Sequence, residues 1–258
     1  MQRSDQDTAS TAGHAVGAND APALSVVIPV KDEVDNIGPL LDEIRDCLSA
    51  LRFEVIVVDD GSRDGTDNVL ENAQSDYSWL RVIRHREACG QSTATHSGVG
   101  AAKADWVVTL DGDGQNPPAG ILKLIEARDA AAQPVAMVAG QREKRHDNWF
   151  RKVSSRVANG VRGGLLKDGI SDTGCSLKLF RRDIFMALPY FDHMHRFLPA
   201  LVQRHGGAVI TAQVSHRHRE HGISKYGFHN RLWPGIVDLI GVLWLQRRTK
   251  LPTIDHRD

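Results

Sequence analysis

The chain has 258 residues, 41% hydrophobic and 25% charged, which is enough for one large globular domain with a real core. Its 32 basic and 32 acidic side chains cancel, and this argues against a general nucleic-acid-binding protein, because such proteins carry a basic excess. We therefore expect no nucleic-acid partner. Three widely spaced cysteines make neither a disulfide framework nor a paired metal motif, so we expect a reducing compartment.

The two ends of the chain differ from its middle. Residues 1–22 are polar and rich in small side chains, which predicts a disordered tail rather than a secretory signal. The longest apolar run near the other end is 235–245, and it contains Asp238. Since a membrane span needs about 20 apolar residues, we expect no membrane-spanning helix.

From residue 24 onward, short β-branched runs alternate with stretches of helical spacing. The first half predicts strands at 24–30, 53–58, 80–83, 105–110 and 135–139, with helices between them. The second half predicts strands near 176–180 and 208–214, a helix at about 195–205 and an amphipathic stretch over 228–248. This alternation predicts a mostly parallel sheet with helices on both faces.

Three polar loops follow strands of this sheet, at 29–33, 59–62 and 111–115. Ligands of parallel sheets bind beyond the carboxyl ends of the strands, where these loops fall. Asp111 and Asp113 can point into one cavity and offer the carboxylate oxygens that Mg²⁺ or Mn²⁺ prefers.

Other readings of the same loops are open at this point. Asp-Gly pairs are also strong turn formers without any ligand. Gly112 and Gly114 lack a Cβ, which would let a diphosphate approach the backbone. Asp64 or Thr66 is expected to cap the helix that follows the second loop.

Taken together, five motifs resemble family 2 glycosyltransferases of the GT-A fold, most closely the dolichol-phosphate mannosyltransferase-like, or polyprenyl-phosphate glycosyltransferase, group. The motifs are VVIPVKDE at 26–33, VDDGSRDGT at 58–66, LDGDGQNPP at 110–118, DTGCSLKLFRR at 172–182 and HRHREHGISKY at 216–226. The resemblance covers about residues 23–230.

It implies an α/β, Rossmann-like GT-A fold: a mostly parallel mixed sheet flanked by helices. The expected organisation is a tail at 1–22, a GT-A domain at 23–227, and a C-terminal amphipathic helix and tail at 228–258.

The resemblance also implies roles for single residues. Asp111, Asp113 and Gln115 would be catalytic, and Asp113 and Gln115 would hold Mg²⁺ or Mn²⁺. The nucleotide sugar would be bound by Pro29, Val30, Glu33, Asp59, Asp60 and Asp111. The acceptor phosphate would be bound by Arg142, Arg151, Ser155, Arg219 and Lys225.

The resemblance implies a metal-dependent enzyme that transfers a sugar, with inversion, from a nucleoside-diphosphate sugar to a polyprenyl phosphate. The polyprenyl chain would be of the undecaprenyl or dolichyl type, and the reaction would belong to cell-envelope biosynthesis. The enzyme would be cytoplasmic and peripheral to the inner face of the cell membrane. A homo-oligomer is an open possibility. The chain departs from the common pattern at Gly112 and Gly114, which replace apolar residues, and at Lys31 and Asp32, which replace Tyr-Asn.

Two alternative functions are weighed. In the first, the acceptor is a saccharide or lipid-glycan hydroxyl, which needs a general base, and Asp172 is the candidate. In the second, the chain binds a nucleotide sugar without turnover.

Four other features are interpreted without a catalytic role. The basic run 142–156 and the apolar side of 228–248 suit a membrane surface, and 228–248 suits a subunit contact as well. The histidines at 216, 218 and 221 are read as solvated or phosphate-facing rather than as zinc ligands. Cys89 and Cys175 are read as small buried residues.

Overall fold

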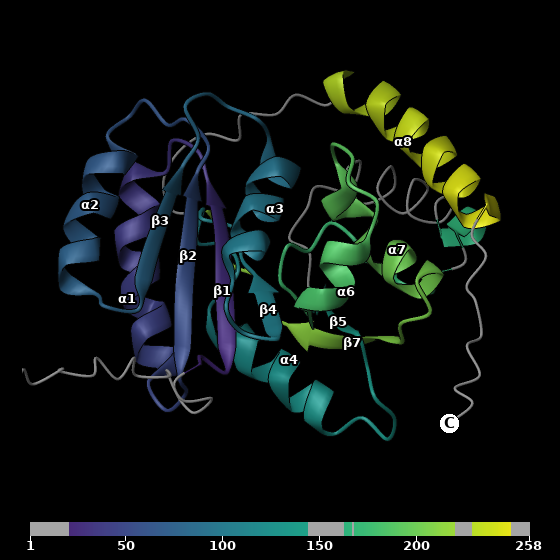
Figure 1. The fold of residues 1–258 in the computed structure, drawn as a ribbon, viewed down its shortest axis with the longest axis horizontal. Helices are drawn as coiled ribbons and strands as arrows, with labels where there is room; N and C mark the ends of the chain where they lie inside the picture. The colour runs from purple at the N-terminus through teal and green to yellow at the C-terminus, as the bar shows by residue number, and fades with distance from the viewer. Residues whose placement is uncertain (1–20, 144–162, 167, 220–228, 249–258) are drawn as a thin grey trace, which may run out of the picture.

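The computed structural model describes residues 21–143, 163–166, 168–219 and 229–248 (Figure 1). Its first half contains β1 (Leu24–Val30), α1 (Val34–Leu48), β2 (Phe53–Asp59), α2 (Thr66–Asp76), β3 (Leu80–Arg84), α3 (Gln91–Ala101), β4 (Trp106–Thr109) and α4 (Ala119–Asp129). Its second half contains β5 (Met137–Arg142), β6 (Lys178–Arg181), α6 (Arg182–Ala187), the short 3-10 helix η1 (Met194–Arg196), α7 (Leu198–Arg204), β7 (Val209–Val214) and α8 (His229–Arg248). Each strand expected from the sequence is present, with ends shifted by a few residues, whereas α6 was not expected.

One sheet of seven strands organises the fold, in the order β3-β2-β1-β4-β6-β5-β7. Every pairing is parallel except the two made by β6, which runs against both β4 and β5. The predicted mostly parallel mixed sheet is therefore confirmed. Because only β6 is reversed, the other six strands all end at the same edge, and β6 begins there.

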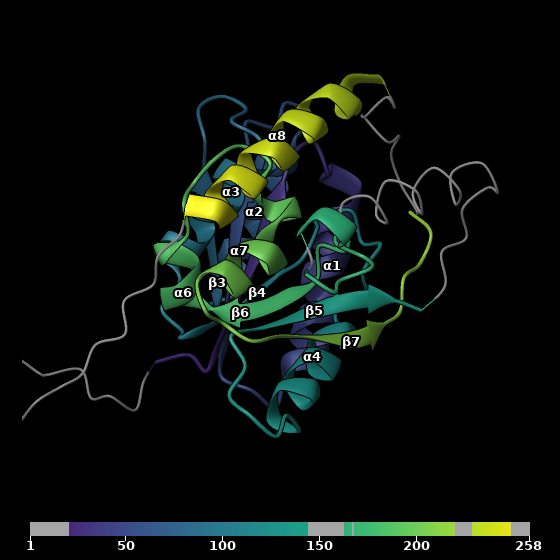
Figure 2. The same cartoon turned by 90° about the vertical axis from the view of Figure 1, so that its right-hand side faces the viewer.

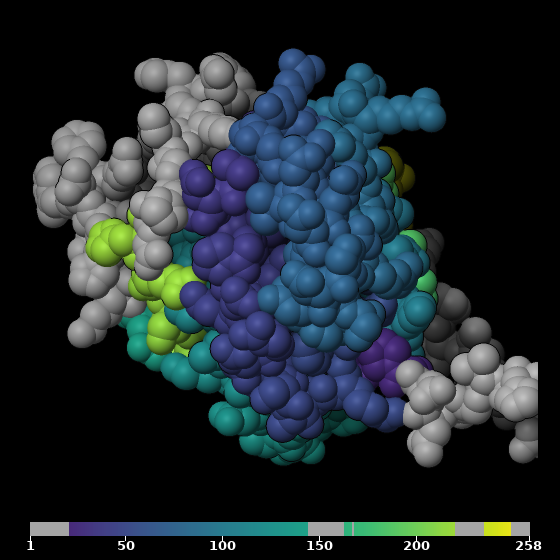
Figure 3. Space-filling model, turned by 90° about the vertical axis from the view of Figure 1, so that its left-hand side faces the viewer, coloured from purple at the N-terminus to yellow at the C-terminus, as the bar shows by residue number. Residues whose placement is uncertain are grey.

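The central strands β1, β2 and β4 are buried on both faces, which explains why they read as continuous apolar runs. Val26, Val27 and Ile28 of β1 have no exposed surface. Helices α1, α2 and α4 cover one face of the sheet, while α3, α6 and α7 cover the other (Figures 1 and 2). Figure 3 looks onto the first of these sides, where α1 and α2 lie next to each other.

Helix α8 lies against the α7 side of the molecule (Figure 1). Val242 is buried there, and Arg204 Nε donates to the Leu245 carbonyl at 3.0 Å. The outer side of α8 is apolar and exposed, with exposed fractions of 41% at Ile236, 63% at Val237, 61% at Ile240 and 58% at Trp244. Among the described residues, no helix is long and apolar enough to cross a membrane.

Helix α3 approaches the sheet closely through a glycine. A Cβ added to Gly98 would lie 2.5 Å from Val27 Cγ1 and 3.1 Å from Val58 Cγ2, whereas one added to Gly100 would meet nothing within 4 Å. The run of small residues in this helix therefore brings α3 into contact with β1 and β2.

This pair of glycines makes a matched test of the packing. Gly98→Ala should destabilise the fold by about 1–3 kcal/mol, because the new methyl group overpacks the interface with β1. Gly100→Ala should stabilise it by up to ~1 kcal/mol through helix propensity. Urea unfolding of both variants measures the difference, and equal effects would contradict this account of α3.

Candidate active site

The three acidic loops lie together because the strands before them are neighbours. β1 pairs in parallel with β2 on one side and with β4 on the other, so all three strands end at one edge of the sheet. At this edge the Asp60 N–H donates to the Val30 carbonyl at 2.8 Å, which joins the first loop to the second.

Side chains of the second loop hold the first loop in place. Ser62 Oγ accepts from the Asp32 N–H at 2.8 Å, and Asp32 has a left-handed backbone with φ of 52°. Asp64 accepts the first N–H of two helices: Oδ2 takes that of Val34 in α1 at 3.1 Å, and Oδ1 takes that of Thr66 in α2 at 3.0 Å. The residue at the N-cap position of α2 is Gly65, so neither Asp64 nor Thr66 is the conventional cap that was expected.

Asp60 organises the loop that follows β3. Its Oδ1 accepts from the Cys89 N–H and lies 2.8 Å from His85 Nδ1, and its Oδ2 accepts from the Gly90 N–H at 2.8 Å. Burial opposes ionisation of Asp60, but the hydrogen bonds from Cys89, His85 and Gly90 outweigh it and lower the pKa of this carboxyl. Asp60 is thus an anion under ordinary conditions.

Asp59 lies deeper than Asp60 and is fully buried. Its Oδ1 accepts from the Ser62 N–H at 2.9 Å, and its Oδ2 lies 3.4 Å from Arg84 Nε. The structure therefore places Asp59 in the framework of the second loop, one layer behind the surface.

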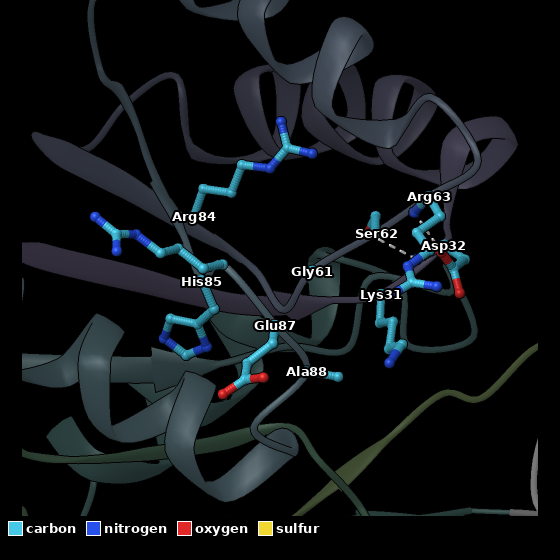
Figure 4. Close-up of a pocket in the computed structure, with 10 residues that line it drawn as sticks. Lys31, Asp32, Gly61, Ser62, Arg63, Arg84, His85, Glu87 and Ala88 are labelled. Atoms are coloured by element: carbon cyan, nitrogen blue, oxygen red, sulfur yellow. Dashed lines mark hydrogen bonds between the residues drawn. The ribbon is translucent and has the colours of Figure 1, made fainter.

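A pocket of about 600 Å³ opens between the first loop, the second loop and the 84–88 segment (Figure 4). In Figure 4, Lys31 and Arg63 lie on one side of Gly61, and His85 and Arg84 lie on the other. The lining is Lys31, Asp32, Gly61, Ser62, Arg63, Arg84, His85, Arg86, Glu87 and Ala88. Four of these ten residues are Lys or Arg, so an anionic ligand matches the pocket.

The two glycines of the third loop have structural causes. A Cβ on Gly112 would lie 2.4 Å from Val30 Cγ1, so the close packing of the third loop on the end of β1 requires glycine there. Gly114 has a φ of 70°, a conformation that side chains rarely adopt. Contact with Val30 and a turn therefore account for both glycines without any ligand.

Asp111 lies at the bottom of the site and accepts from Gln91 Nε2, at the start of α3, at 2.8 Å. Removal from water and the nearby charge of Asp113 raise the pKa of the Asp111 carboxyl to about 6, although Lys178 and Arg142 favour its ionised form. Lys178 is itself buried, and that burial lowers its pKa. Its ammonium donates to the carbonyls of Thr173 and Cys175.

The segment after β7 crosses the third loop and brings two arginines. The Arg217 N–H donates to the Gln115 carbonyl at 2.9 Å, and its guanidinium donates to the Gly114 carbonyl. Arg219 Nη2 lies 2.6 Å from Glu33 Oε2, and Arg219 Nη1 lies 3.9 Å from Asp113 Oδ2. Arg219 therefore links the first motif to the third, and it is mostly buried there, with a side-chain exposure of 19%.

Arg142, at the end of β5, makes a two-pronged ion pair with Asp172. Arg142 Nε donates to Asp172 Oδ2 and Arg142 Nη2 donates to Oδ1, both at 2.7 Å. Side-chain exposures of 14% and 10% show that both groups are largely removed from water. Both carboxylate oxygens of Asp172 are thereby engaged by one guanidinium.

The structure brings together most of the residues that the sequence singled out. Those at the shared edge are Pro29, Val30, Glu33, Asp59, Asp60, Asp111, Asp113, Gln115, Arg142, Asp172 and Arg219. Arg151, Ser155 and Lys225 lie outside the described residues.

Cys175 is buried as expected, but the expectation for Cys89 is wrong, because Cys89 is exposed. Its loop lies beside the pocket, and the thiol donates to the Glu87 carbonyl of the same loop at 3.4 Å.

Four residues of the site were given no role in the sequence analysis: His85, Gln91, Lys178 and Arg217. Each reaches the site from a distant part of the chain, since Gln91 is 20 residues from Asp111 and Arg217 is 103 from Gly114. The polar Gln91 at the start of an otherwise small-residue helix was the available signal for one of them.

The oxygen donors of the third loop fit a hard divalent cation. Asp113 Oδ1 accepts from the Gln115 N–H at 3.1 Å within the loop, and its Oδ2 lies 3.9 Å from Arg219 Nη1. Asn116 Oδ1, in the same loop, is buried and has no hydrogen-bond partner among the described residues. A buried amide oxygen without a partner and two nearby carboxylates are the donors that Mg²⁺ and Mn²⁺ take.

Comparison with known proteins identifies a family. The sequence model described as "Glycosyl transferase family 2" matches residues 25–188. The dodecaprenyl-phosphate galacturonate synthase of Rhizobium johnstonii is 33% identical over 238 residues, covering 89% of this chain and 69% of that protein. The undecaprenyl-phosphate 4-deoxy-4-formamido-L-arabinose transferase of Edwardsiella ictaluri is 37% identical over 207 residues, covering 79% of this chain and 63% of that protein. The chain thus spans about two thirds of the length of these relatives.

Solved structures share the fold at low sequence identity. Mannosyl-3-phosphoglycerate synthase from Rubrobacter xylanophilus has a TM-score of 0.68 at 16% identity, covering 90% of this chain and 77% of that one. Glucosyl-3-phosphoglycerate synthase from Mycobacterium tuberculosis, crystallised with Mn²⁺, UDP and glucosyl-3-phosphoglycerate, has a TM-score of 0.66 at 18% identity, covering 87% of this chain and 80% of that one. The expected GT-A-like α/β fold is confirmed by these neighbours.

The raised pKa of the Asp111 carboxyl leads to a prediction on stability. Between about pH 4 and pH 6 the folded state holds a proton on Asp111 that the unfolded state has lost, so unfolding becomes easier as the pH rises through this window. Above pH 6 the ionised carboxylate remains a cost. In the presence of a chelator, Asp111→Asn should therefore raise the free energy of unfolding at pH 7.5 by about 1–2 kcal/mol. This is part of the ~3 kcal/mol that corresponds to a pKa raised by about two units.

Thermal unfolding from pH 4 to pH 7.5 measures this gain, which should shrink toward pH 4. Asp105→Asn, at an exposed position beside β4, is the matched control and should change little at any pH. A destabilised Asp111→Asn protein at pH 7.5 would contradict the assignment of a raised pKa.

Proposed function

The chain belongs to glycosyl transferase family 2, and from this premise we propose that it transfers a sugar from a nucleoside-diphosphate sugar to a polyprenyl phosphate, with inversion at the anomeric carbon. The observation that carries the proposal is the gathering of three acidic loops at one sheet edge, bridged there by Arg219. The named acceptors of the two similar relatives support the choice of a polyprenyl phosphate.

The nucleotide end of the donor is assigned to the pocket between the first two loops. Asp60 is ionised and directly precedes Gly61 of the pocket lining, so we assign the base to this wall; Pro29, Val30 and Glu33 lie at the end of the adjacent strand. The basic lining from Lys31, Arg63 and Arg84 suits the negative charge of a nucleotide.

The diphosphate is assigned to the edge between Asp113 and Arg219. A divalent cation held by Asp113, with Gln115 and Asn116 beside it, would offset the negative charge that builds on the leaving nucleoside diphosphate. Mn²⁺ or Mg²⁺ in the structurally similar glucosyl-3-phosphoglycerate synthase supports this choice of metal. Arg219 lies beside Glu33 and Asp113 at this edge, and a guanidinium makes strong, charge-assisted bonds to phosphoryl oxygens.

A phosphate acceptor needs no general base, because it is already anionic near neutral pH, with a second pKa of about 6. The hydroxyl-acceptor alternative would need one, and its candidate Asp172 has both oxygens engaged by Arg142. This ion pair therefore favours the phosphate acceptor. A purely binding protein is disfavoured as well, because ionising Asp111, whose pKa is raised, costs stability that nucleotide binding alone would not require.

We further propose that the enzyme is peripheral to the inner, cytoplasmic face of the membrane and contacts it through α8. Ile236, Val237, Ile240 and Trp244 form an exposed apolar side, and Arg247 and Arg248 follow at the end of the helix. The Arg248 guanidinium lies 6.0 Å from the centre of the Trp244 ring. Apolar and aromatic side chains next to arginines suit an anionic lipid surface, from which a polyprenyl phosphate is reached.

The transfer itself is tested with purified protein, polyprenyl phosphate, a panel of nucleotide sugars and Mn²⁺. A lipid-linked sugar should form with one donor, and Arg219→Gln should lower its rate roughly 100-fold because a donor to the developing charge is lost. Arg45→Gln, an exposed arginine of α1, should leave the rate unchanged. Turnover only with a saccharide hydroxyl, abolished by Asp172→Asn, would establish the alternative instead.

Membrane contact is tested by sedimentation with vesicles that contain phosphatidylglycerol. Replacing both Ile240 and Trp244 by Ser should weaken binding more than tenfold, since burying each large apolar side chain contributes about 1.5–3 kcal/mol. Met186→Ser, at an exposed apolar position on α6, is the control and should bind like the unaltered protein. If the double variant instead only changes the oligomeric state, α8 is a subunit contact.

A further inference from the structure

A second cluster of metal-binding groups lies beside the pocket and is distinct from the oxygen donors of the third loop. Asp60, His85 and Cys89 each offer one ligand atom, and these atoms all lie within 4.8 Å of one another. Among the described residues, this is the one group of three or more His, Cys, Asp or Glu side chains placed in this way. It combines a carboxylate, an imidazole and a thiol, a set that hard cations do not select.

We infer that Asp60, His85 and Cys89 form a binding site for Zn²⁺ or a similar thiophilic ion, and that its occupation excludes a nucleotide from the pocket. The ligand atoms of a tetrahedral zinc ion are about 3.3–3.7 Å apart, as follows from its bond lengths. Asp60 Oδ1 and His85 Nδ1 are now 2.8 Å apart, so a small opening of this pair admits the ion. Three protein ligands leave a fourth position for water.

The surroundings of the three ligands are already those of a metal site. His85 Nε2 lies 3.0 Å from Ser97 Oγ, a contact that orients the ring and leaves Nδ1 facing Asp60. Outer partners of this kind accompany most metal-bound histidines. The Gly90 N–H stays bonded to Asp60 Oδ2 while Oδ1, which accepts from the Cys89 N–H, turns to the ion, so one backbone anchor of the loop is kept throughout.

The proton balance of binding is simple. Before the ion binds, Nδ1 of a neutral His85 carries the ring proton and donates it to the Asp60 carboxylate. On binding, this proton passes to Nε2, where it is donated to Ser97 Oγ, and Nδ1 coordinates the ion. The Cys89 thiol loses its proton to solvent as the Zn–S bond forms. Cys89 is exposed, so the ion and the released proton both have direct access to water. One proton per zinc is therefore released, and binding strengthens as the pH rises.

Competition with the nucleotide follows from shared residues. Asp60 is the group assigned to the base, and His85 lines the pocket of about 600 Å³. An ion bound between these two side chains occupies Asp60 Oδ1. It also places a positive charge and a water molecule at the His85 side of the pocket. This second part of the inference rests on the proposed function, whereas zinc binding itself does not.

The zinc site is tested on the full chain by titration against a chromophoric chelator and by substitution with Co²⁺. One ion should bind, and the Co²⁺ protein should show thiolate-to-metal charge-transfer absorption. Cys89→Ser should abolish that absorption and weaken zinc binding at least tenfold. His85→Gln should weaken zinc binding as well, while any ion still bound through Cys89 keeps the absorption. Cys47→Ser, on α1 at the opposite face, is the matched control and should change neither. Unchanged zinc affinity in Cys89→Ser would overturn the site.

Competition is measured separately, by nucleoside-diphosphate binding under saturating Mg²⁺ with and without zinc. Zinc should weaken nucleotide binding to the unaltered protein and not to Cys89→Ser, while both should bind the nucleotide equally when zinc is absent. If zinc binds through Cys89 yet leaves nucleotide affinity unchanged, the exclusion and the nucleotide role of Asp60 both fail, although the metal site stands. If no zinc binds, the inference fails and the proposed transfer is unaffected.

Discussion

The parallel pairing of β1 with both β2 and β4 is the constraint on which the site depends. It requires strands with no exposed face, and Val26, Val27 and Ile28 meet that requirement. Once these strands are in register, the loops that carry Glu33, Asp60 and Asp113 have to emerge side by side. The reversed strand β6 then brings the 172–178 segment to the same edge, so Asp172 and Lys178 join the site from the opposite chain direction.

Concentrating carboxylates at one edge has an electrostatic cost, and the molecule offsets it with cations drawn from elsewhere. Arg219 forms ion pairs with Glu33 and Asp113, and Arg142 forms one with Asp172. The charge of Lys178 favours the ionised form of Asp111. The compensation at Asp111 is incomplete, which its raised pKa records. Catalytic sites are often destabilising in the absence of their ligands. Binding of a cation or a nucleotide then supplies the missing stabilisation.

The sequence predicted what is local and missed what is distant. Strands such as β1 and β2 could be recognised because burial on both faces leaves an unbroken apolar run, and the acidic loops follow directly after them. The partners of those loops could not be found in this way, since Gln91 and Arg217 meet the third loop only through the fold. Gly112 shows a third case: the residue was noticed, but contact with Val30, which only the structure reveals, accounts for it without a ligand.

The late position of Arg219 in the chain has a consequence for biosynthesis. Glu33 is made 186 residues before the arginine that neutralises it, and β5 finds its parallel partner β7 only after about 70 further residues have emerged. Because such non-local pairings form slowly, a partly synthesised chain holds an acidic edge without its cation. In the nascent protein, the carboxylates of Glu33 and Asp113 therefore gain their guanidinium partner only when the segment after the last strand has docked.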